Sequence, residues 1–362
     1  MIKKAMLISL LLPAAFGVSQ EAPVINGAVS KSGMVDTKIT RGLNRYNRLV
    51  KIADSKGDFL CSLELSGYAL RDVLDRIGIK KQNDGFDRPL DTFITAKGGG
   101  NRVLFSFGEV FLCGDEGPLL ADSAKMILPH RHPPLNAGKN DPTVLLDVKK
   151  RNSIDLSVCI SCHEGPTPPK LHFPKGWMLI AAQDGFAGRF VENLTEINVS
   201  QVGIEVKDTR ATSRDSVVET PTIIGPDGRK HAFELSDFEK LPRVMVRDAG
   251  IGEGKGYRGI ATWEGVPLKG LLRHLLPEGT DPQNTYVLVT AVDGYRAVYS
   301  GMEVFNSLDE KCALLIDRKN GDPMGKGAGL YNIIPRSDFF VDRNVRMVKE
   351  IRLLIVGDTR KN

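Results

Sequence analysis

The sequence predicts an α+β protein of two tandem domains, each with a mixed β-sheet and short helices, and with a long loop inserted in the first domain. Three observations lead to this prediction. The chain has 362 residues, a length that suits two domains of ordinary size. Its 37 glycines and 20 prolines favour many turns and short strands over a helical bundle. Several segments of the first half recur in the same order in the second half, which indicates two copies of one domain.

Each predicted copy contains a short strand, a turn with a glycine and an amphipathic helix. These features occupy residues 59–79 in the first half and residues 257–277 in the second half. Gly67 and Gly265 mark the turns, and leucines three and four positions apart follow each of them. Because that spacing places the leucines on one face of a helix, we expect a helix that packs on the sheet.

A predicted β-hairpin comes next in each copy, over residues 91–111 and 284–305. Both segments have a β-rich run, a glycine turn, a second β-rich run and the sequence Glu-Val-Phe, a pattern typical of a hairpin. The copies also end alike, over residues 176–199 and 329–356, where a β-rich start and a polar loop precede a last strand.

The domain boundaries follow from a polar, charged stretch without apolar periodicity at residues 201–218. We expect the first domain over residues 20–200 and the second over residues 219–362. The first domain carries an insertion at about residues 121–175, rich in Pro, Gly and Asn, which the second lacks. Chemistry is often added to a scaffold in such loops.

Residues 1–19 have the pattern of a secretory signal peptide. Lys3 and Lys4 precede an apolar run at residues 5–18, and small residues follow it. The run is shorter than the roughly 20 residues that span a bilayer, and no other segment approaches that length, so we expect no transmembrane segment. We expect an exported, periplasmic protein, with an uncleaved membrane anchor as the alternative.

The composition excludes other classes of partner. Hydrophobic residues make up 41% and charged residues 26%, as in ordinary globular chains. The formal net charge of +5 is small and evenly spread, so we expect no nucleic-acid partner.

Cys159, Cys162 and His163, in the insertion, form a C-x-x-C-H motif, the pattern of covalent haem attachment. Two thiols at this spacing reach the two vinyl groups of one porphyrin, and the imidazole that follows binds the iron. The motif resembles the haem-binding site of c-type cytochromes. We therefore expect one covalent haem c and a function in electron transfer with a redox partner protein.

His130 and His132 are the candidate distal ligands of the iron, because the chain between them and the motif is long enough to wrap the ring. His172 and Met178 are further candidates. Three other interpretations of the motif stay open: a zinc site formed with two of the histidines, a dithiol–disulfide pair, and a chance match. With zinc or a disulfide at the motif, the protein would be a non-redox periplasmic binding module.

The second half resembles the molybdopterin-binding domain of the sulfite oxidase family, over residues 222–356. The resemblance rests mainly on the run from Trp263 to Leu268, on Asp293-Gly294-Tyr295 and on Pro335. The first half follows the pattern more weakly. The resemblance implies a twisted mixed sheet with short helices, and it makes a molybdopterin-dependent oxidoreductase the alternative function.

One departure from this family concerns the metal ligand. Active members supply a cysteine thiolate to molybdenum from a turn upstream of the tryptophan segment, and here Asp248 stands at that place. A carboxylate is a hard ligand and replaces a thiolate poorly. We therefore do not expect molybdopterin chemistry, and an enzymatic activity stays an open alternative. The candidate donors to a pterin or phosphate are Arg247, Arg258, Arg296, Arg336 and Arg343.

The remaining cysteines carry a weaker signal. Cys61 and Cys113 lie in neighbouring predicted elements, so they could pair in an oxidising compartment. Cys312 would then be a free thiol.

Overall fold

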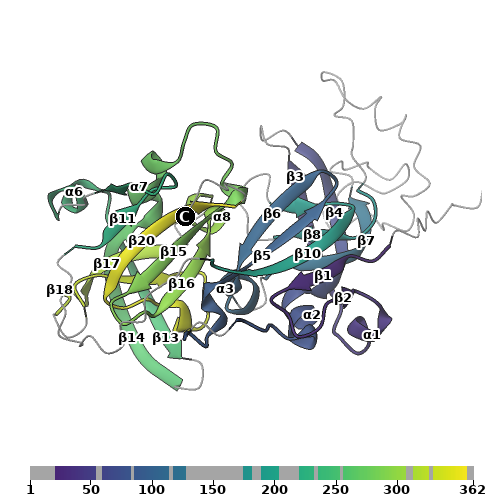
Figure 1. Cartoon of the computed structure of the whole chain (residues 1–362), viewed down its shortest axis with the longest axis horizontal. Helices are drawn as coiled ribbons and strands as arrows, with labels where there is room; N and C mark the ends of the chain where they lie inside the picture. Colours follow the sequence, from purple (N-terminus) through teal and green to yellow (C-terminus); the bar gives the residue numbers. More distant parts are fainter. Residues whose placement is uncertain are drawn as a thin grey trace, which may run out of the picture.

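The computed structural model describes residues 21–53, 59–82, 85–113, 117–127, 174–181, 189–203, 220–231, 235–252, 256–306, 313–325 and 329–356. Over these residues the protein is mostly β-structure, with four mixed or antiparallel sheets and a few short helices (Figure 1). The α+β class expected from the sequence is therefore corrected towards β. The predicted amphipathic helices exist but are short: α2 (Leu70–Ile77) has 8 residues and α7 (Leu268–Leu272) has 5.

Gly67 and Gly265 lie inside long strands and not in turns, which is a second correction. They belong to β4 (Phe59–Ala69) and β14 (Gly256–Pro267). A Cβ atom at either glycine would stand 2.1 Å from a carbonyl oxygen of the neighbouring strand, that of Leu120 or of Leu315. Each position is also a register shift in the strand pairing. Glycine is required there because two backbones approach closely, a use that a sequence does not distinguish from a turn.

The two halves of the chain have similar strand orders, which differ in the last strands of the second sheet, and Figure 1 shows them side by side. In the first half one sheet has the order β2-β1-β10-β5-β6 and the other β3-β4-β7-β8-β9. The remaining bounds are β1 (Val24–Gly27), β2 (Gly33–Met34), β3 (Tyr46–Ala53), β5 (Thr92–Gly98), β6 (Asn101–Ser106), β7 (Leu119–Ile127), β8 (Met178–Ile180), β9 (Phe190–Val191) and β10 (Leu194–Gln201).

In the second half the corresponding orders are β12-β11-β20-β15-β16 and β13-β14-β17-β18, with β19 paired to β17. In each half one pair is parallel, β1 with β10 and β11 with β20. The bounds are β11 (Thr222–Ile224), β12 (Lys230–His231), β13 (Val244–Gly252), β15 (Thr285–Ala291), β16 (Arg296–Ser300), β17 (Ala313–Lys319), β18 (Asp322–Pro323), β19 (Asn332–Pro335) and β20 (Val348–Ile355).

The two predicted hairpins are confirmed as the pairs β5–β6 and β15–β16. Each is followed by a short helix that starts with a capping box, in which Ser106 pairs with Glu109 and Ser300 with Glu303. The glutamate of the repeated Glu-Val-Phe therefore closes the first turn of a helix. The described residues also form the helices α1 (Thr37–Thr40), α3 (Phe107–Phe111), α6 (Leu235–Lys240) and α8 (Gly301–Phe305), and the 3₁₀ turns η1 (Pro89–Asp91), η3 (Arg273–Leu275), η4 (Pro282–Asn284) and η6 (Val341–Arg343).

None of the helices in the described part of the chain has the length and apolar character that a membrane crossing requires.

The insertion predicted at about residues 121–175 begins inside β7 and ends just before β8, and these two strands are antiparallel neighbours in one sheet. β7 ends at Ile127 and β8 begins at Met178, whereas the corresponding strands β17 and β19 of the second half are joined by residues 320–331. The connection between these two paired strands is therefore longer in the first half than in the second. Cys159, Cys162, His163, His130 and His132 lie outside the described residues, as does the predicted signal peptide.

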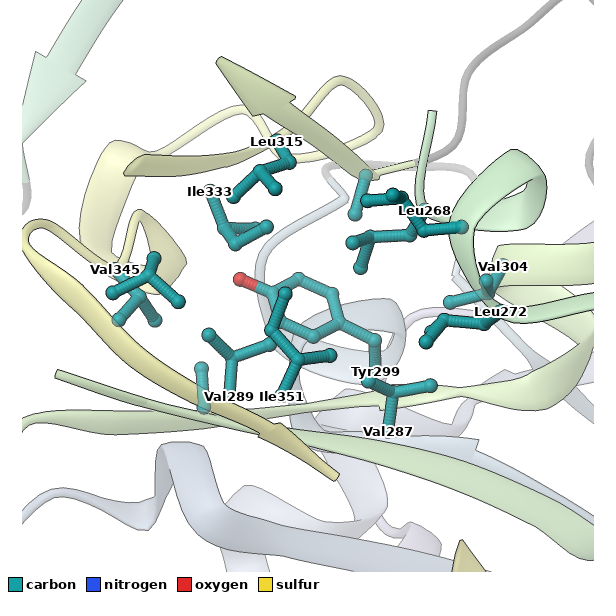
Figure 2. Close-up of a cluster of buried hydrophobic side chains, with 14 of the residues drawn as sticks. Leu268, Leu272, Val287, Val289, Tyr299, Val304, Leu315, Ile333, Val345 and Ile351 are labelled. Atoms are coloured by element: carbon teal, nitrogen blue, oxygen red, sulfur yellow. The ribbon is translucent and has the colours of Figure 1, made fainter. Parts of the chain in front are cut away.

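The core of the second half surrounds Tyr299, whose side chain is fully buried (Figure 2). Its ring lies among aliphatic side chains from β15, α7, β17, β19 and β20, while its hydroxyl donates a hydrogen bond of 2.6 Å to the backbone oxygen of Arg343. Burial raises the pKa of Tyr299 well above its ordinary value, so the hydroxyl remains a donor.

The two halves contact each other through equivalent hairpins. Phe93 and Tyr286 occupy the same position in β5 and β15, and their rings stack with centroids 4.8 Å apart. Buried side chains on both sides, including Leu104 and Val298, complete an apolar cluster there. The interface is thus approximately two-fold symmetric, like that of a homodimer.

A buried ionic network beside this cluster follows the same symmetry. Arg189 of the first half pairs with Glu109 at 2.5 Å and donates to Ser300 Oγ at 3.2 Å. Arg343 of the second half pairs with Glu303 and donates to Ser106 Oγ at 2.7 Å. Each half therefore sends one buried arginine to its own glutamate and to the capping serine of the other half.

Candidate functional site

A pocket of about 430 Å³ lies in the second half, on the sheet formed by β13, β14, β17 and β19. Its wall includes Asp248 and Gly250 of β13, and Ala261 and Trp263 of β14. These residues are two positions apart along each strand, so they point to the same face of the sheet. Arg88 reaches the pocket from the first half.

The strand registers identify the corresponding positions of the first half. Gly67 pairs with Tyr46 and Ala121, and Gly265 pairs in the same way with Val244 and Ile316. Counting from these glycines, the pocket residues Asp248, Gly250, Ala261, Trp263, Ile316, Asn332 and Ile334 correspond to Val50, Ile52, Leu63, Leu65, Ala121, Met178 and Ile180.

The first half has a closed apolar cluster where the second half has the pocket. All seven corresponding residues of the first half are buried in one hydrophobic cluster. In the second half a glycine replaces Ile52, an alanine replaces Leu63 and an aspartate replaces Val50. Burial of an aliphatic side chain contributes about 1.5–3 kcal/mol to the free energy of unfolding. The second half lacks this contribution at the three replaced positions. Such a cost is expected where a cavity serves binding.

The charged residues of the wall include four cations, Arg88, Arg258, Lys319 and Arg346, and three carboxylates, Asp248, Asp293 and Asp342. Each carboxylate has a donor within the protein. Asp342 Oδ1 lies 3.3 Å from Arg88 Nη1. Asp293 and Asp248 accept backbone N–H bonds from Tyr295 at 3.0 Å and from Ala249 at 2.8 Å.

Two guanidinium groups of the wall are available for a ligand. Arg258 and Arg346 have neither a hydrogen bond nor an ion pair with any other residue in the described ranges. Lys319 Nζ lies over the ring of Trp263, 5.0 Å from its centroid, and Arg88 lies over Tyr295 at 5.6 Å. Burial raises the pKa of Tyr295, so its hydroxyl stays protonated and donates to the backbone oxygen of Asp342.

Several residues singled out in the sequence meet in this pocket. They are Asp248, Arg258, Trp263, Asp293 and Tyr295. Sequence reasoning missed Arg88, Lys319 and Arg346, because Arg88 arrives from the other half and the other two lie outside the family pattern.

Other candidate arginines are not in the pocket wall. Arg296 is buried and pairs with Asp91 of the first half at 2.8 Å, and Arg343 belongs to the interface network. Arg247 and Arg336 are exposed and do not line the pocket. These four residues are therefore not donors to a ligand in this pocket.

The pocket does not fit a thiolate-bound molybdenum. No cysteine lines it among the described residues, and Asp248 offers only a carboxylate. Cys113 is a free, buried thiol and not half of a disulfide; its Sγ donates to the backbone oxygen of Glu109 at 2.8 Å. Within the described ranges no three His, Cys, Asp or Glu side chains gather as a metal site would require.

The fold and the pocket define a mostly β protein of two similar halves, of which the second has a charged cavity. No protein-family model matches the chain, and no curated protein matches it. Among solved structures, the sulfane dehydrogenase SoxCD from Paracoccus pantotrophus is similar, with a TM-score of 0.31 and 13% sequence identity. That match covers 61% of this chain and 56% of the other, so it spans just over half of that protein.

Proposed function

We propose that the protein is an exported electron-transfer protein that carries one haem c, bound covalently by Cys159 and Cys162 with His163 as an axial ligand. The single observation that carries this proposal is the C-x-x-C-H motif. The signal-peptide pattern at residues 1–19 supports it, because covalent haem attachment takes place outside the cytoplasm. The bound haem supplies one-electron chemistry between ferrous and ferric iron.

The position of the motif in the fold also supports the proposal. The motif belongs to a connection between two paired strands, β7 and β8, and the corresponding connection of the second half is short. A long connection between rigid neighbours can acquire a cofactor without disturbing the sheet.

The distal ligand is His130 or His132 in this proposal. Two histidine ligands generally give a lower reduction potential than a histidine with a methionine, so this choice sets which partners can exchange electrons with the protein.

The experiment is expression of the full chain in a host with the cytochrome c maturation machinery. We expect a red protein, a pyridine haemochrome spectrum of haem c, and a haem mass increment that survives denaturation. Cys159→Ser and Cys162→Ser should each lose one thioether bond, whereas Cys312→Ser, a cysteine outside the motif, should keep both. Loss of the low-spin spectrum in His130→Ala or in His132→Ala would identify the distal ligand.

Other outcomes would refute the proposal. A colourless protein with stoichiometric zinc supports a zinc site, and a colourless protein with a bond between the sulfurs of Cys159 and Cys162 supports a disulfide. A molybdopterin-dependent oxidoreductase is the second candidate, and it rests on the resemblance of residues 222–356 to the sulfite oxidase family. Molybdenum and pterin released on denaturation, without a covalent adduct, would establish it in place of the haem protein.

A further inference from the structure

We propose that the pocket of the second half binds a small organic oxyanion with an apolar or aromatic part, held by the guanidinium groups of Arg258 and Arg346. This site lies in the half without the haem motif, so it is independent of the proposed electron transfer. A carboxylate and a phosphate ester share the required chemistry, a planar or tetrahedral group of negative oxygens joined to an apolar body.

The shape of the site supports a ligand, because the corresponding face of the first half is filled with side chains and that of the second half is not. Val50, Ile52 and Leu63 close the corresponding face of the first half. Asp248, Gly250 and Ala261 leave that face open in the second half. The fold therefore does not impose the hollow, and the volume of about 430 Å³ lies in the range of small-molecule pockets.

The charge distribution selects an anion. The three carboxylates of the wall each accept a hydrogen bond from the protein, whereas Arg258 and Arg346 have no such partner among the described residues. A guanidinium group matches the oxygens of a carboxylate or phosphate with two parallel N–H bonds. A free metal cation would instead meet these unpaired positive charges.

The rest of the wall suits an apolar body. Trp263 is half-buried, and Ile316 and Ile334 are buried on the same face of the sheet. Lys319 covers the ring of Trp263. A ligand with a ring or short chain can therefore lie against this wall while its charged end contacts the arginines.

The test uses three probes on the full chain, measured by ligand-observed NMR and calorimetry. Phenyl phosphate has both the anion and the ring, inorganic phosphate has only the anion, and benzyl alcohol has only the ring. We expect phenyl phosphate to bind and the other two to bind at least about tenfold more weakly.

Variants locate the binding. Arg258→Ala and Arg346→Ala should each weaken phenyl phosphate binding about tenfold, the effect of one lost charge-assisted contact. Arg273→Ala is the matched control, because Arg273 is an exposed arginine of the same half that does not line the pocket. A double variant, Asp248→Val with Ala261→Leu, restores two of the three side chains that fill the first half, and it should abolish binding while the urea midpoint stays equal or rises.

Three results would overturn the proposal. The first is that phenyl phosphate at millimolar concentration gives no binding signal. The second is that the Arg258, Arg346 and Arg273 variants all bind it equally. The third is that protein made in a molybdopterin-producing host releases a pterin, and that the double variant does not. If the double variant does not fold, the two arginine variants and their control still decide the outcome.

Discussion

Replacing Arg343 by methionine tests the buried network that joins the two halves. The Arg343 side chain is fully buried and pairs with Glu303 and Asp338, whose side chains are 4% and 1% exposed. It also donates to Ser106 Oγ of the first half. Methionine has a similar length but no charge, so the substitution leaves two buried carboxylates without their cation.

The expected loss is large because the carboxylates stay out of water. Breaking a buried pair by removing one partner costs about 3–5 kcal/mol, against a total stability of about 5–15 kcal/mol for a typical protein. Burial raises the pKa of Glu303 and of Asp338, and the nearby charge of Arg343 opposes that rise without cancelling it. Without the arginine the folded carboxyls bind protons more readily, so the loss should shrink as the pH falls.

The assay is urea denaturation at about pH 8 and about pH 5, followed by tryptophan fluorescence. The chain has 2 tryptophans, Trp177 in the first half and Trp263 in the second. Trp177→Phe and Trp263→Phe backgrounds therefore report the two halves separately, and both transitions should shift because the network spans the interface.

The matched control is Arg229→Met, which removes a surface arginine of the second half with a side chain that is 82% exposed. Exposed pairs contribute about 0–1 kcal/mol, so this change should be nearly neutral. A loss below about 1 kcal/mol for Arg343→Met at pH 8, or one no larger than the control, would show that the network does not hold the halves together.

Three further predictions concern the same interface and its surroundings. Burial raises the pKa of Glu303 from 4.5 to about 7, so the folded protein holds a proton on this carboxyl that the unfolded chain has already lost. The unfolding free energy should therefore fall as the pH rises through about 7. In urea titrations at several pH values, Glu303→Gln should flatten this slope. Gly108→Ala places a Cβ 2.1 Å from Cζ of Arg343 and should cost about 1–3 kcal/mol by thermal unfolding. Gly270→Ala on α7 places a Cβ in ordinary contact with Val266 Cγ1, at 3.9 Å, and should stabilise by about 0.5–1 kcal/mol; equal effects would contradict the packing argument. Tyr286→Leu removes the ring stacked on Phe93, and it should lower the unfolding free energy by about 0.5–1.5 kcal/mol beyond the effect of the lost buried area. A double-mutant cycle with Phe93→Leu measures this stacking energy, and strictly additive single effects would show that it is absent.

Features that depend on a few neighbouring residues were predictable. The hairpins β5–β6 and β15–β16 follow from alternating apolar runs around a glycine turn, and their capping boxes need only a serine and a glutamate three positions apart. The glycines were harder: Gly67 and Gly265 carry the same signal as a turn, but the structure uses them for close contact between strands.

The pocket was only partly predictable. A family pattern pointed to Asp248, Arg258 and Trp263, and these residues do meet in one wall. Arg88 carried no such signal, because its place in the pocket depends on how the halves pack. The interpretation of Arg296 and Arg343 as candidate ligand donors was wrong for the same reason. Both side chains are buried against acidic residues and do not face a ligand.

By itself the sequence determined the duplicated pattern of strands, the two hairpins and the residues of the C-x-x-C-H motif, since each depends on spacing along the chain. Only the tertiary structure decided which copy is hollow, which arginines are buried and which face a cavity. The physical reason is that burial and charge pairing arise between residues far apart in sequence, such as Ser106 and Arg343, whose contact exists only once the two halves have packed.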